Sequence, residues 1–348
     1  MYQVRSGSFF YTLDWLTVIC GVWLPDKDKI KFKTILNLLW NFSLLSGCLM
    51  MFICELLLFK GSISELRQLF RVIGMIFTHT LGIAKFYTLT VHQRRINNLK
   101  NVLEDKMYYY EDVDSFQPSR IFIESKVFVK KLLIVTYLMY TMVGGAAHIT
   151  GSINLKRYSH EEYINGNITC YDFLSYSFVI PFPTPTKSSC QLALGVMDIG
   201  LFSFASYIVC YDSYFAVLII CVKTKLKILF EATRTIRKRT LYKMKLPTNF
   251  EIFKDDDFPK LEAMLYCEIR KCAKHLNSIL WVCEEIECIF SYTILIQILS
   301  AFLTIASILY TSSQITINDP EMFASAQYLT AILLQLSMIC YFGNEVTE

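Results

Sequence analysis

Long runs of apolar residues are the dominant pattern along this chain. Six of them approach or exceed about 20 residues, the length that a helix needs to cross about 30 Å of hydrocarbon. The predicted membrane-spanning helices cover about Ile35–Phe59, Gln68–Thr90, Phe128–Thr150, Leu192–Val222, Ile289–Tyr310 and Met322–Phe342. The sequence therefore predicts an all-α, multi-span helical membrane protein with six spans.

Apolar positions at helical spacing continue beyond two of these runs. They extend from Cys221 to Leu246 with cations between them, which predicts that the fourth helix continues into the cytoplasm. Pro247 to Pro259 is predicted to be a loop, and helical spacing resumes at about Lys260 and runs into the fifth span. Two projecting helices need partners for their apolar stripes, which predicts a cytoplasmic helical assembly domain.

The segment before the first span is apolar but too short to cross a bilayer. It is predicted to form an interfacial helix with Trp15 and Trp23 at headgroup level. The expected organisation is a cytoplasmic N-terminal segment with this helix at 1–34, spans one to four at 35–222 with an extracellular loop at 151–190, cytoplasmic helical extensions and a loop at 223–288, and spans five and six with the start of a cytoplasmic tail at 289–348.

Charge sets the expected orientation. The chain has 34 Lys and Arg residues, and most of them lie in the segments 1–34, 91–131 and 221–278. Basic loops are retained in the cytoplasm, so the N-terminus and both long basic loops are predicted to face that side. The hydrophobic share of 54% and the mean hydropathy of +0.39 exceed the values of a soluble domain and fit this interpretation.

The predicted extracellular loop at 151–190 contains two candidate modification sites. Asn167 begins an Asn-Ile-Thr sequon, and a lumenal position predicts N-glycosylation there. Cys170 and Cys190 lie in the same loop, where they either form a disulfide or remain free thiols. The remaining cysteines fall mostly in spans or cytoplasmic segments and form no C-x-x-C pair, so no metal site is predicted.

Ionisable residues inside spans are costly and therefore informative. His79 lies at mid-span, where it either lines a polar cavity or bonds a carbonyl between helices. For Asp212 we predict a hydrogen bond between helices. Four others lie near the predicted span ends, where snorkelling or contact with solvent is sufficient: Glu55, Lys85, His148 and Asp198.

The outer halves of the second, third, fourth and sixth spans combine large aromatic with small residues. This mixture is typical of apolar ligand cavities with a few polar contacts, although each residue has helix packing as its alternative role. The candidate ligand-binding residues are Ile73, Phe77, His79, Tyr140, Gly144, Met197, Phe202, Phe323, Gln327 and Tyr328.

Enzyme motifs are not found. The sequence has no glycine-rich nucleotide loop, Walker A sequence or H-E-x-x-H motif, so we expect no enzyme activity and no cofactor. The basic stretch at 232–240 adjoins a span, where topological charge explains it better than a nucleic-acid partner. Membrane lipids are the expected surroundings.

Three stretches together resemble the insect odorant receptor family, and the weakest of them is YDSYFAVLIICVKTKLKIL together with the N-terminal GVWLP. KCAKHLNSILWVCEEIECIFSYTILIQIL, from Lys271 to Leu299, is similar to that family's fifth-helix signature. CYFGNEVTE, from Cys340 to Glu348, is similar to its segment at the inner end of the sixth helix. The positions that the resemblance implies in cytoplasmic assembly are His275, Leu280, Glu284, Phe342, Gly343 and Asn344.

The resemblance implies a seven-helix receptor with a cytoplasmic N-terminus, in the plasma membrane of olfactory sensory neurons. It also implies a ligand-gated cation channel, a heterotetramer with co-receptor subunits that detects small apolar or volatile odorants. The family's seventh helix lines the pore, and the sequence as given ends at Glu348 before it, so we expect no complete pore from these residues alone. A gustatory receptor of the same superfamily and a secondary transporter are the alternatives.

Overall fold

The long helices of the fold follow the apolar runs. The computed structural model describes residues 8–22, 32–113, 116–156, 169–176, 178–247, 259–314 and 320–344. These residues are helical with short connections, and six helices have the length and apolar composition needed to cross a membrane. The expected fold class, an all-α protein with six spans, is confirmed, while the orientation in the membrane stays a prediction.

Each predicted span lies within one long helix. The helices are α1 (Tyr11–Ile19), α2 (Phe32–Gly61), α3 (Leu66–Val91), α4 (Gln93–Leu103), α5 (Pro118–Lys156), α7 (Lys187–Arg234), α8 (Ile236–Lys243), α9 (Pro259–Ser313) and α10 (Pro320–Asn344), and the short 3-10 turns are η1 (Ser62–Ser64), η2 (Lys106–Tyr108) and η3 (Cys170–Phe173).

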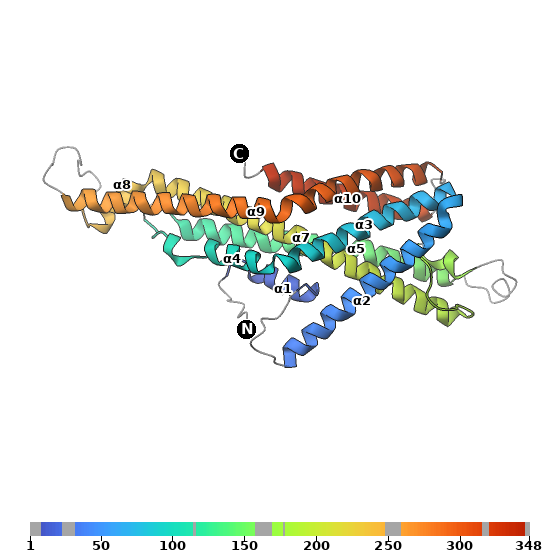
Figure 1. The fold of residues 1–348 in the computed structure, drawn as a ribbon. Coiled ribbons are helices and arrows are strands. Elements are labelled where there is room, and N and C mark those ends of the chain that lie inside the picture. Colours follow the sequence, from blue (N-terminus) through green and yellow to red (C-terminus); the bar gives the residue numbers. More distant parts are fainter. Residues whose placement is uncertain are drawn as a thin grey trace.

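The helices form an elongated bundle with α7 at its centre (Figure 1). α7 packs against α2, α3, α5, α9 and α10, and nearly every residue from Ser203 to Val222 is buried. One end of the bundle, here called the basic end, contains α8 and the first half of α9, with α4 packed beside α9. The opposite end, here called the loop end, carries the α2–α3 junction and residues 169–186.

Two helices are much longer than a bilayer is thick. α7 has 48 residues and α9 has 55. At 1.5 Å per residue they extend for about 70 and 80 Å, against about 30 Å of hydrocarbon. Both project at the basic end, where α8 packs on α9 (Figure 1). The helical spacing after the fourth span and before the fifth predicted these helical extensions, and their cytoplasmic position stays a prediction.

α1 is held against the bundle rather than isolated at its surface. Phe9, Phe10 and Leu13 are buried in the main core, and Lys100 of α4 donates a buried hydrogen bond to Asp14. Trp15 is exposed, as an interfacial residue would be, while Trp23 lies outside the described residues. The helix that sequence analysis placed at an interface therefore also packs against protein.

Close approach of α5 and α7 depends on a glycine. A Cβ atom at Gly151 would lie 2.6 Å from a methyl carbon of Leu194 and 3.2 Å from the carbonyl oxygen of Phe173. The backbone atom cannot yield easily, so only glycine fits without displacing the η3 segment. Gly151 therefore lets α5, α7 and the η3 segment approach closely at the loop end.

Candidate functional site

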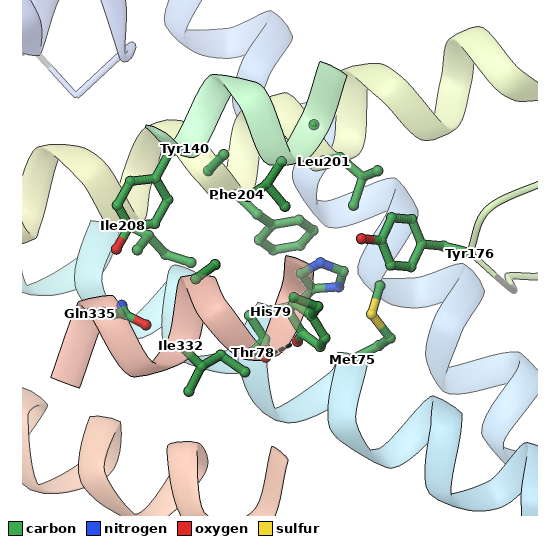
Figure 2. Close-up of a pocket in the computed structure, with 15 residues that line it drawn as sticks. Met75, Thr78, His79, Tyr140, Tyr176, Leu201, Phe204, Ile208, Ile332 and Gln335 are labelled. Atoms are coloured by element: carbon green, nitrogen blue, oxygen red, sulfur yellow. Dashed lines mark hydrogen bonds between the residues drawn. The ribbon is translucent and has the colours of Figure 1, made fainter. Parts of the chain in front are cut away.

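A small cavity lies between α3, α5, α7 and α10, in the half of the bundle toward the loop end (Figure 2). Its volume is about 90 Å³, and its wall is mostly apolar. A cavity with an apolar wall and a few polar groups is the usual form of a small-molecule binding site. The lining residues are Met75, Thr78, His79, Tyr140, Val143, Gly144, Tyr176, Leu201, Phe204, Ala205, Ile208, Tyr328, Ala331, Ile332 and Gln335.

Small residues and one hydroxyl pair create this space. Gly144 of α5 has no atom within 4 Å of an ideal Cβ position, so the lack of a side chain there leaves open volume. Across the cavity, the hydroxyls of Thr78 and Tyr328 form a hydrogen bond that joins α3 to α10. The missing side chain at Gly144 leaves the space, and the Thr78–Tyr328 hydrogen bond links two of the helices that surround it.

A buried ion pair lies at the end of the cavity nearer the basic end. Lys85 Nζ of α3 donates to Asp212 Oδ1 of α7 at 2.5 Å, and both side chains are at most 1% exposed. Two cavity-lining side chains donate to the other carboxylate oxygen: Tyr140 at 3.2 Å and Gln335 at 3.1 Å. Asp212 therefore joins four helices, α3, α5, α7 and α10.

This arrangement tests two expectations. The predicted hydrogen bond between helices at Asp212 is confirmed. The expectation that Lys85 snorkels toward the headgroups is wrong, because its ammonium group is fully buried beside the carboxylate. The sequence separation of 127 residues hides this partner from any local pattern.

A second buried pair flanks the cavity on its α2 side. His79 Nδ1 lies 2.6 Å from Glu55 Oε2, and the His79 ring stacks on Phe204 at 3.8 Å between centroids. Of the two roles left open for His79, the structure shows cavity lining, with a carboxylate as its partner instead of a carbonyl. Glu55 is buried, so solvent contact does not explain it.

A neighbouring cavity of about 350 Å³ lies between α5 and α7. It shares Tyr140, Gly144, Leu201 and Ala205 with the first cavity, so these four residues separate two adjoining spaces. His148 and Asp198 line it as well.

His148 and Asp198 form an ion pair at 2.6 Å, with the histidine side chain 55% exposed. The expected solvent contact near the span end is therefore present at His148.

The structure brings together only part of the predicted ligand-binding set. His79, Tyr140, Gly144 and Tyr328 line the first cavity, and Phe202 lines the second. Four predicted residues line neither cavity: Ile73, Phe77, Met197 and Gln327. Met197 is fully buried in the packed core instead. The side chain of Phe323 lies outside the described residues.

Three polar lining residues were missed by sequence reasoning. Gln335 lies seven residues after Tyr328, so helical spacing from that predicted residue indicates it, whereas Thr78, adjacent to His79, is not on the same helix face by spacing. Tyr176 comes from the loop end, where no periodicity exists. It reaches the cavity because Ser175 donates to the Ala147 carbonyl and the Val179 amide donates to the Cys54 carbonyl.

The residues expected in assembly occupy the basic half of α9 and the end of α10. His275 is buried, with its ring stacked on Tyr108 at 4.5 Å. Leu280 and Glu284 are exposed on α9. On α10, Phe342 is buried, whereas Gly343 and Asn344 are exposed. Their role in assembly stays a prediction.

The aromatic segment Tyr108–Tyr110, which follows α4 at the basic end, packs among cationic side chains. Tyr110 is buried, its hydroxyl lies 3.1 Å from His275 Nδ1, and the Arg239 guanidinium lies 5.0 Å from its ring centroid. Burial raises the pKa of Tyr110, which keeps the phenol neutral. Arg239 also donates to Glu268 at 2.8 Å. These contacts join the segment after α4 to α8 and α9 as a packed structural element.

The two loop cysteines share one small cluster at the loop end. Cys170 and Cys190 are both buried and pack with Phe173 and Ala193. Burial raises the pKa of Cys170 to about 12, and contact with Cys190 contributes. The choice between a disulfide and free thiols for this pair stays as the sequence left it, and glycosylation of Asn167, which lies outside the described residues, stays a prediction.

Comparison with known proteins adds an assignment to this geometry. The chain is similar to two structures of the insect olfactory receptor OR5 from Machilis hrabei. For the first, the TM-score is 0.66 at 12% identity; for the second, a complex with eugenol, it is 0.67 at 13% identity. Each match covers 97% of this chain and 79% of the receptor. A comparison with curated proteins gave no match. The sequence model described as 7tm Odorant receptor matches residues 65–348, and the chain therefore belongs to the odorant receptor family.

Proposed function

We propose that this chain is an odorant receptor subunit of a ligand-gated cation channel that detects small volatile odorants. The observation that carries the proposal is the cavity between α3, α5, α7 and α10, whose apolar wall holds a few polar side chains. The family assignment favours this function over a gustatory receptor or a transporter. The relative in complex with eugenol supports a small organic ligand.

The proposed mechanism uses the carboxylate of Asp212. Tyr140 and Gln335 line the cavity and also donate to Asp212, so a ligand in contact with them meets the junction of four helices. A ligand changes the balance of closed and open channels only if it binds one state more tightly. The shared carboxylate gives a physical route to that difference, because moving either donor changes the hydrogen bonding between helices.

Partners and placement follow from the same proposal. The subunit assembles with co-receptor subunits in a heterotetramer, in the plasma membrane of olfactory sensory neurons. The exposed apolar residues on α2, such as Leu39 and Phe42, suit contact with lipid chains. The basic end faces the cytoplasm, which the collection of Lys and Arg there supports.

The test is odorant-evoked current. The receptor is expressed with a co-receptor in cells that lack other receptors, and currents are recorded against a broad odorant panel. We expect cation currents that are absent with the co-receptor alone. Silence toward the whole panel, with the receptor detected at the cell surface beside the co-receptor, would contradict the proposed function.

A further inference from the structure

Two ring side chains on the cavity wall each carry a polar group that has no hydrogen-bond partner among the described residues. One is the hydroxyl of Tyr176, which Figure 2 shows directed toward the ring of His79. The other is His79 Nε2, since Glu55 engages only Nδ1. Among the other polar lining groups, Thr78 and Tyr328 bond each other, and Tyr140 and the amide nitrogen of Gln335 donate to Asp212.

The proton on His79 Nε2 follows from charge neutrality. If Glu55 is ionised and His79 is a cation, both ring nitrogens carry protons. If Glu55 keeps the proton and donates it to Nδ1, the neutral ring carries its proton on Nε2. Nε2 is therefore a donor in both neutral forms of the pair.

The alternative form leaves a net negative charge in the bundle. An ionised Glu55 beside a neutral His79 with its proton on Nδ1 would make Nε2 an acceptor. Glu55 and His79 are at most 4% exposed, and the second carboxylate oxygen of Glu55 is buried without a partner. An uncompensated buried charge within a membrane span is costly, which favours the two neutral forms over this one.

We propose that the cavity selects ligands that carry a hydrogen-bond acceptor, such as the carbonyl oxygen of a ketone, ester or aldehyde. The Nε2–H group of His79 and the hydroxyl of Tyr176 are the two donors, and the apolar wall takes the hydrocarbon part. A protonated amine brings a net charge into a mostly apolar wall and is disfavoured. This inference rests on the proposed function and names the class of ligand.

The experiment compares three ligands of equal chain length: a methyl ketone, an alkane and a primary amine. Competition binding is measured on membranes that contain the full receptor with its co-receptor. We expect the ketone to bind on the order of 10-fold more tightly than the alkane, from two hydrogen bonds. The amine should bind more weakly than the ketone.

Variants separate the two donors. Tyr176→Phe should weaken ketone binding about 3–10-fold and leave alkane binding unchanged. Tyr137→Phe is the matched control, because Tyr137 lines only the neighbouring cavity and should change neither ligand. Since His79→Phe alone would leave Glu55 unpaired, the double variant Glu55→Leu/His79→Phe removes the pair together and should reduce the ketone preference by a similar factor.

Equal binding of ketone and alkane to the wild-type receptor would overturn this inference while leaving the receptor function intact. An equal loss for both ligands in Tyr176→Phe would also overturn it, since that result indicates a packing role. Tightest binding by the amine would show that acceptors on the wall decide selectivity and would overturn the inference. If no member of the series or of a broader panel binds, the proposed function itself fails.

Discussion

The ion pair of Lys85 and Asp212 provides the sharpest test of how this bundle is held together. Lys85→Met removes the cation and keeps a side chain of similar length. Asp212 is then left with two neutral donors, Tyr140 and Gln335, in place of three partners. Removing one partner of a fully buried pair costs about 3–5 kcal/mol of unfolding free energy, because the other charge stays buried.

The double variant distinguishes this mechanism from a loss of packing. Lys85→Met/Asp212→Asn is neutral and keeps a carbonyl oxygen that accepts from Tyr140 and Gln335. It should therefore recover more than half of the stability that Lys85→Met loses. Additive losses in the double variant would mean that the two residues act independently.

The assay is thermal unfolding of the purified receptor complex, which is monitored as the loss of its monodisperse peak in size-exclusion chromatography. At about 2 °C per kcal/mol for a large chain, Lys85→Met should lower the midpoint by roughly 6–10 °C. The control is Arg120→Ala, whose pair with Glu124 is exposed at both ends and contributes about 0.3–0.5 kcal/mol. A shift in Lys85→Met no larger than in this control would refute the reasoning.

Three further predictions address the cavity and the loop end. Gly144→Leu places a side chain in the space shared by both cavities and should abolish odorant-evoked current, whereas Gly195→Leu, also in open space but lining neither cavity, should preserve it. Peptides that contain Cys170 and Cys190 should be recovered joined by a disulfide under non-reducing conditions, because the bond forms during folding, before burial suppresses the reactive thiolate. Two alkylated free thiols in receptor that has passed through the secretory pathway would contradict this. Glycosidase treatment should increase the gel mobility of the wild-type chain and leave Asn167→Gln unchanged, and an unmodified Asn167 would argue against an extracellular loop there.

The long helices could be read from sequence because the bilayer restricts the choices. Every backbone amide in hydrocarbon must be satisfied within its own segment, so an apolar run of sufficient length forms a helix. The helical spacing after the fourth span and before the fifth corresponds to helical structure in α7, α8 and α9. Local pattern determined these features because helix formation depends on residues three and four positions apart.

The cavity was predictable only where it depends on a helix face. His79, Tyr140, Gly144 and Tyr328 lie on faces that sequence analysis selected, and they line the cavity. Met197 is on a similar face of α7 but is buried in packed core, because which part of a face meets a neighbour depends on how the helices cross. Tyr176 enters from a loop whose path is set by contacts with α2 and α5.

The sequence by itself determined the apolar helices, their approximate limits and the types of residue available for a cavity. Tertiary structure decided the partners: Lys85 with Asp212, Glu55 with His79, and Tyr110 with His275 and Arg239. Each of these contacts joins residues on different elements, so no spacing along the chain encodes it. A buried charge requires a partner, but only the packing of distant helices determines which residue provides it.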